Sequence, residues 1–105
     1  MTASEELLSQ GLLLIYAEED CVPCKGYLRA LRECGPEITA SLRYVSTDPA
    51  SRAKRWARSL PEGSQVYLMK NRKDFSFLMA TPTTQSRKGL KVGPLSCKEI
   101  KEMQP

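Results

Sequence analysis

The chain has 105 residues, enough for one hydrophobic core and too few for two domains that are stable alone, so we expect a single domain over residues 1–105. Its 41% apolar and 27% charged residues are typical of a globular protein and exclude a disordered or fibrous chain. The net charge is +4, and basic residues are concentrated at residues 52–58, 70–73 and 87–91; we expect these to be solvated surfaces and expect no nucleic-acid partner.

The first two elements are a short helix and an apolar strand. Ser4 can cap a helix through Leu8, which Gly11 ends, and residues 12–17 form a continuous apolar run. Such a run is typical of a strand that is covered on both faces. It is too short to cross a membrane, and the acidic residues 1–10 lack the basic start of a secretory signal. We therefore expect a cytoplasmic protein with no membrane partner.

The middle of the chain predicts two helices and a strand between them. Apolar residues recur at helical spacing over 24–34, and residues 42–46 read as a strand. A second helix starts at residues 47–49, and its apolar face includes Trp56. We expect this tryptophan to belong to the core.

The C-terminal part predicts two strands and a last helix. Residues 61–80 form an irregular or inserted segment, a hairpin being one interpretation. Strands follow at residues 83–86 and 90–92, and Ser96 and Glu99 form a capping box at the start of the last helix. The order of elements predicts an α/β domain with a central mixed sheet flanked by helices.

The apolar strand leads into a cysteine pair, Cys21-Val22-Pro23-Cys24, at the start of a helix. A thiol exchanger needs one partly ionised sulfur that attacks and a second that resolves the mixed disulfide. The helix dipole and free amides stabilise a thiolate on the first cysteine, and the first helical turn directs the second inward. We therefore expect Cys21 to be the nucleophile and Cys24 the resolving thiol. Pro23 suits a first turn, where its missing N–H has no helical partner.

The remaining cysteines bear on a competing interpretation, a zinc site. Zinc needs two ligands besides the pair, and the chain has no histidine. Cys34 lies about 15 Å along the predicted helix from Cys24, too far to share a site or a disulfide with it. We expect no metal, a buried apolar Cys34 and a packed, inert Cys97. A third active thiol is the alternative for Cys97, because it begins the last helix.

Residues 4–25 and 81–102 resemble the thioredoxin and glutaredoxin superfamily, and thioredoxin more closely. The strand, the acidic turn and the sequence Cys21-Val22-Pro23-Cys24-Lys25 look like the approach to a thioredoxin active site. Thr81-Pro82-Thr83 looks like the cis-proline turn of that family. The resemblance implies a thioredoxin-like fold, a cis Pro82 and backbone hydrogen bonds from Thr81 to a substrate peptide. It also implies that Val22, Pro23 and Gly93 help to form the substrate site.

The chain also departs from the thioredoxin pattern. Asp20 stands where thioredoxins have a tryptophan, and Val22 replaces a glycine. Leu14 or Ile15 replaces their buried aspartate, which leaves the proton partner of Cys24 unassigned.

The acidic turn before the pair, Glu18-Glu19-Asp20, sets further expectations. Its negative charge opposes ionisation of Cys21. It also repels glutathione, an anion, and favours substrates with basic residues near the disulfide.

These residues together predict a thiol-disulfide oxidoreductase that reduces protein disulfides through Cys21 and Cys24. No cofactor is needed beyond this redox-active pair, and an external thiol or reductase supplies electrons. We expect a monomer. The alternative is a protein-binding or adaptor module on the same fold with little catalytic activity, which the absent aspartate and the segment at 61–80 favour.

Overall fold

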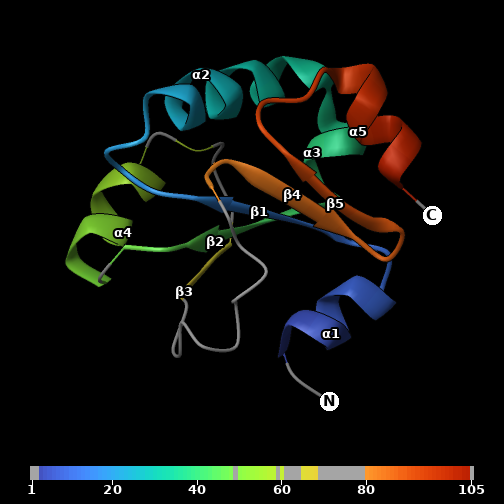
Figure 1. Ribbon diagram of the computed structural model, residues 1–105, viewed down its shortest axis with the longest axis horizontal. Helices are drawn as coiled ribbons and strands as arrows, with labels where there is room; N and C mark the ends of the chain where they lie inside the picture. The colour runs from blue at the N-terminus through green and yellow to red at the C-terminus, as the bar shows by residue number, and fades with distance from the viewer. Residues whose placement is uncertain (1–2, 49, 59, 61–64, 69–79, 105) are drawn as a thin grey trace.

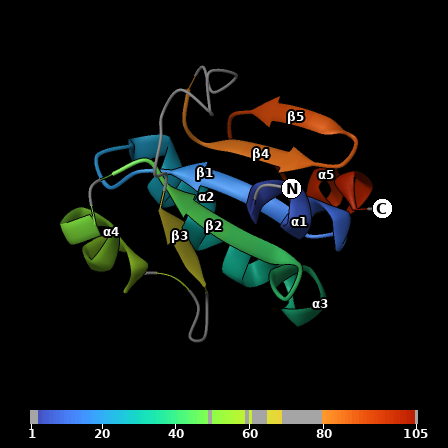
Figure 2. The same cartoon turned by 90° about the horizontal axis from the view of Figure 1, so that it is seen from below.

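The computed structural model describes residues 3–48, 50–58, 60, 65–68 and 80–104. A five-stranded mixed sheet with the order β3-β2-β1-β4-β5 has helices on both faces (Figures 1 and 2). The elements in chain order are α1 (Ala3–Ser9), β1 (Leu13–Ala17), α2 (Val22–Leu31), the 3-10 helix η1 (Arg32–Cys34), α3 (Pro36–Thr39), β2 (Leu42–Ser46), α4 (Ala50–Ala57), β3 (Val66–Leu68), β4 (Thr83–Ser86), β5 (Gly89–Val92) and α5 (Cys97–Met103).

The central strand β1 is buried on both faces, as its continuous apolar run predicts. Successive side chains of a strand point to opposite faces. On one face, Leu13, Ile15 and Ala17 pack with residues of α2, α4 and α5. On the other, Leu14 and Tyr16 pack with residues of α1. Figure 1 shows α2 and α5 above the sheet and α1 below it.

The sheet combines a parallel half with an antiparallel half. β1 pairs with β2 and β2 with β3 in parallel, while β4 is antiparallel to both β1 and β5. The two parallel pairs are connected through helical segments, as parallel neighbours require. Because β1 and β2 run in the same direction, their carboxyl ends meet at one edge of the sheet, where α2 begins.

Two expectations from the sequence change in the structure. The predicted helix over 24–34 is not continuous: α2 ends at Leu31, η1 follows, and Gly35 with φ +95° separates it from α3. In the predicted irregular segment, residues 66–68 form β3, a parallel edge strand beside β2. Its half-buried Val66 and Tyr67 pack on opposite faces of the sheet, which explains why they form a strand. Residues 69–79, and with them the rest of the hairpin interpretation, lie outside the described residues.

The arrangement is α/β with a mixed sheet between helices, consistent with a thioredoxin-like fold. The sequence predicts β2, the strand at 83–86 and the capping box at Ser96 and Glu99, and all three are present. Within the described part of the chain, no helix is long and apolar enough to cross a bilayer.

Candidate redox site

Cys21 and Cys24 lie at the amino end of α2 and form a disulfide, with Cα atoms 5.1 Å apart. Cys21 is the N-cap of the helix, and its Sγ accepts a hydrogen bond from the Cys24 backbone N–H at 3.1 Å. Pro23 occupies the first turn of α2, where a backbone N–H would have no helical partner. Cys21 retains 7% exposure and Cys24 none. Of the two cysteines, only Cys21 can therefore be reached from outside; the roles predicted for them stay predictions.

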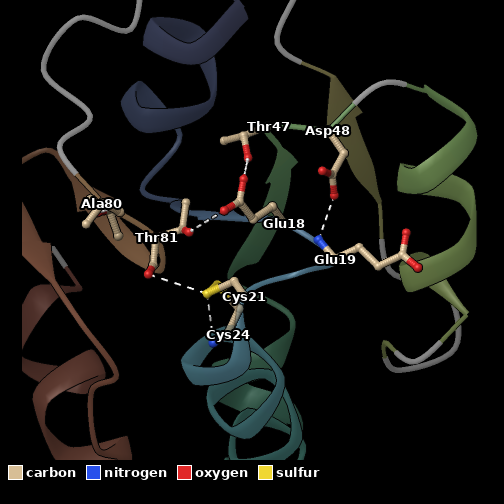
Figure 3. Close-up of a disulfide and its surroundings, with 9 residues drawn as sticks. Glu18, Glu19, Cys21, Cys24, Thr47, Asp48, Ala80 and Thr81 are labelled. Atoms are coloured by element: carbon tan, nitrogen blue, oxygen red, sulfur yellow. Dashed lines mark hydrogen bonds between the residues drawn. A yellow bond between two sulfur atoms is a disulfide. The ribbon is translucent and has the colours of Figure 1, made fainter.

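The turn before β4 faces this disulfide (Figure 3). The Thr81–Pro82 peptide bond is cis, as the resemblance implies, and Pro82 is fully buried. The carbonyl oxygen of Thr81 lies 3.4 Å from the Sγ of Cys21. In the disulfide this is a close contact, and in the dithiol state the Cys21 S–H can donate to that oxygen. The cysteine pair and the cis-proline turn, which lie far apart in the sequence, thus come together at the sulfur of Cys21.

Gly93 contacts the same cis-proline turn through its backbone. Its backbone N–H donates to the carbonyl oxygen of Pro82 at 2.8 Å, and its φ of +94° lies in the left-handed region that favours glycine. Thr83 supports the turn as well, because its hydroxyl donates to the carbonyl oxygen of Ala80. Gly93 therefore holds the cis-proline turn in place, and its predicted role toward a substrate stays a prediction.

Val22 and Pro23 present apolar surface beside the reachable sulfur. Val22 is 78% exposed, more than any other large hydrophobic side chain among the described residues, and Pro23 is exposed too. Their placement is compatible with the predicted contact to a substrate.

Glu18 links three segments around the site, a role that sequence reasoning missed. Its Oε2 accepts a hydrogen bond from the Thr47 hydroxyl at 2.9 Å, and its Oε1 accepts one from the Thr81 hydroxyl at 3.4 Å (Figure 3). The carboxylate at the end of β1 thereby connects the end of β2 to the residue before the cis-proline. Its position directly after the apolar strand was the available signal, because strand ends converge there.

The other two acids of the turn are paired with basic residues of α4. Asp20 lies 3.3 Å from Arg52, and Glu19 lies 3.6 Å from Arg55. The backbone N–H of Glu19 also donates to Asp48 at 2.6 Å. The sequence predicts that this turn opposes ionisation of Cys21, but two of its three carboxylates have cationic partners in the structure. Their repulsion of an anion at Cys21 is correspondingly reduced.

The surroundings of Cys24 are apolar, and Ile15 belongs to the same core cluster. Leu14 and Ile15 are both fully buried, so the buried position on β1 has no carboxylate. One turn further along α2, the Tyr27 hydroxyl and the Thr84 hydroxyl form a hydrogen bond at 2.8 Å. Burial raises the pKa of Tyr27 to about 12, so this hydroxyl stays neutral at physiological pH.

Cys34 and Cys97 form a second disulfide, and the predictions for both residues are wrong. Cys34 is only half-buried and Cys97 is exposed. The predicted continuous helix would have carried Cys34 away along a straight axis, whereas the chain turns at η1 and α3 and brings it to the start of α5. The even number of cysteines was a signal for a second pair.

Among the described residues, no group of three or more Cys, Asp or Glu side chains is placed to hold a metal ion. No protein-family model matches the sequence, and no curated protein matches it. Among solved structures, the chain is similar to a conserved protein of unknown function from Bacteroides fragilis. The two share 19% identity over 87% of this chain and 77% of the other, with a TM-score of 0.58. This likeness shows the α/β fold.

Proposed function

We propose that the protein is a thiol-disulfide oxidoreductase of the thioredoxin-like superfamily that acts on protein disulfides. One observation carries the proposal: Cys21 retains 7% exposure, and its sulfur caps a helix and lies 3.4 Å from the Thr81 carbonyl oxygen before a cis-proline. Such a sulfur is reachable, and the Cys24 backbone N–H can stabilise its thiolate. Cys24 is close enough to form a disulfide with it.

The thiol-disulfide exchange proceeds in two steps. In the dithiol state, the Cys21 thiolate attacks one sulfur of a substrate disulfide, forms a mixed disulfide and releases the other substrate sulfur as a thiolate. The Cys24 thiolate then attacks the Cys21 sulfur, releases the second substrate thiol and leaves the Cys21–Cys24 disulfide. Two electrons pass from the protein to the substrate. An external thiol or reductase returns two electrons and two protons, so no further cofactor is required.

The substrate would lie across the cis-proline turn and the exposed start of α2. Val22 and Pro23 offer apolar contact, and the backbone around Thr81 offers hydrogen bonds along an extended peptide. We further propose that the protein acts as a monomer.

Reduction of insulin disulfides in the presence of dithiothreitol tests the proposal. We expect catalysis by the wild type, complete loss in Cys21→Ser, and a trapped mixed disulfide with a substrate protein in Cys24→Ser. Lys98→Ala is the control, because it removes an exposed side chain on α5 outside the site and leaves both disulfides intact. Catalysis that survives Cys21→Ser would refute the proposal.

A binding or adaptor module is the second candidate, and the apolar surroundings of Cys24 favour it. Leu14 and Ile15 leave the resolving cysteine without a carboxylate on β1 to take up its proton. This candidate requires that the wild type shows no insulin reduction above dithiothreitol alone.

The compartment follows from the redox state of the second disulfide in cells. A cytoplasmic location is the expectation from the sequence, and there Cys34 and Cys97 would be kept as thiols. The disulfide between them in the structure is instead typical of an oxidising compartment. Alkylation of the protein in intact cells, followed by mass spectrometry, distinguishes the two.

A further inference from the structure

A basic groove of about 610 Å³ runs between α2 and α4, beginning beside the redox site. Its floor is formed by two buried side chains, Leu28 and Trp56. One wall carries Lys25, Arg29 and Arg32, which are all exposed. Their spacing of four and three residues places them on one side of α2 and its η1 extension.

The opposite wall adds Arg55 and Arg58, so five cations of the described part of the chain line the groove. Among the described residues, the acids that line it are Glu18 and Glu19, at the end near the disulfide. Glu18 accepts hydrogen bonds from two threonine hydroxyls, and Glu19 is paired with Arg55. The local charge of the groove is therefore positive along most of its length.

This charge is not balanced within the helices themselves. Neither α2 nor α4 contains an acidic residue, so neither has the pairs of opposite charge that normally accompany exposed cations on a helix. No carboxylate of the described residues forms an ion pair with Lys25, Arg29, Arg32 or Arg58. Clustered cations without partners repel one another and attract an anionic ligand.

The dimensions favour a polypeptide over a single small anion. At 1.5 Å per residue, Lys25 lies about 6 Å along the helix from Cys21, and Arg32 lies about 10 Å beyond Lys25. A single carboxylate or phosphate cannot contact cations spread over such a length and over two helices. An extended peptide rises about 3.3 Å per residue, so four or five residues span it.

We propose that this groove binds an acidic segment of the polypeptide whose disulfide the site exchanges. The segment carries its Asp or Glu side chains about two to five residues from the reactive cysteine. The identity of this partner rests on the proposed function, but the binding itself requires no sulfur chemistry. The proposal replaces the expectation of basic substrates, because the acids on which that expectation depends are paired or hydrogen-bonded within the protein.

The first test measures binding without redox chemistry. A fluorescein-labelled, cysteine-free peptide with five Asp and Glu residues is titrated with the oxidised full chain at low salt, and its anisotropy is followed. A lysine counterpart and a single-stranded DNA of equal length are the comparison probes. We expect the acidic peptide to bind best, and Arg29→Glu with Arg32→Glu to weaken it on the order of tenfold.

The matched control reverses two exposed lysines on α5, Lys98→Glu with Lys101→Glu, which lie outside the groove. Equal weakening by both double variants would show that only net charge matters and would overturn the proposal. DNA or lysine peptide binding as tightly as the acidic peptide would overturn it too.

The second test compares reduction of two peptide disulfides that differ only in having Glu or Lys at positions two to five from the cysteine. We expect the wild type and the α5 control to show a higher kcat/KM for the Glu peptide, and the Arg29 and Arg32 double variant to lose this preference. Insulin reduction that depends on Cys21, with no preference between the peptides, would remove the groove proposal and leave the proposed function intact. Binding of the acidic peptide without any reduction of insulin would leave the groove proposal intact and remove the proposed function.

Discussion

Removal of the Cys34–Cys97 disulfide should destabilise the protein far more than removal of the disulfide at the redox site. The second disulfide joins residues 63 apart in the sequence and ties the end of the α2 segment to the start of α5. A cross-link stabilises mainly by restricting the unfolded chain, and the effect grows with the loop it closes. For this loop the chain-entropy relation gives about 4 kcal/mol, against about 2 kcal/mol for the three-residue separation of Cys21 and Cys24.

Urea unfolding followed by circular dichroism measures this difference. The perturbation is the double variant Cys34→Ala with Cys97→Ala, and the control is the chemically matched Cys21→Ala with Cys24→Ala. With urea slopes of about 1–3 kcal/mol per molar, a loss of about 4 kcal/mol lowers the midpoint by more than about 1 M. The control should lose less than half as much free energy of unfolding. A loss below about 1 kcal/mol in the first variant, or free thiols at Cys34 and Cys97 in the purified protein, would refute the reasoning.

Four further predictions concern single side chains. Val22→Ser should change the free energy of unfolding by less than about 0.5 kcal/mol, because Val22 is 78% exposed, yet lower kcat/KM for insulin by about threefold; an unchanged kcat/KM would exclude a substrate contact. Ser96→Ala removes the N-cap of α5 and should cost about 1 kcal/mol in urea unfolding, and a neutral effect would count against the capping box. Glu18→Ala removes the carboxylate that accepts hydrogen bonds from the Thr47 and Thr81 hydroxyls, and should cost about 1–3 kcal/mol in urea unfolding. An unaltered midpoint would show that the carboxylate does not hold the turn. Burial raises the pKa of Tyr27 from 10.0 to about 12, so the unfolded chain loses this proton first and stability falls as the pH rises from 10 to 12; Tyr27→Phe should reduce that fall in alkaline unfolding curves, and an identical fall would contradict the assignment.

Local signals explain which features were predictable. The unbroken apolar run identifies β1 because a central strand is covered on both faces, and such a strand needs no polar alternation. The capping box is recognisable because Ser96 and Glu99 are three residues apart, and the side chain of each accepts a hydrogen bond from the backbone N–H of the other. The position of Cys21 as an N-cap follows from the same kind of short-range pattern.

Features that depend on the packing of distant segments were not predictable. The pairing of Cys34 with Cys97 requires the break after Leu31 and the turn at Gly35, which helical periodicity does not reveal. The partners of the acidic turn come from α4, about thirty residues later in the chain, so its charge could be read from the sequence but not its neutralisation. The basic groove arises because two helices without acids, α2 and α4, both contribute to its lining.

A redox titration of the Cys21–Cys24 pair, with each cysteine alkylated and located by mass spectrometry, tests the central claim most directly. The account predicts that this pair converts between dithiol and disulfide at a midpoint above about −300 mV, with Cys21 alkylated first, while Cys34–Cys97 is still oxidised there. A Cys21–Cys24 pair that stays oxidised at potentials where Cys34–Cys97 is already reduced would contradict it.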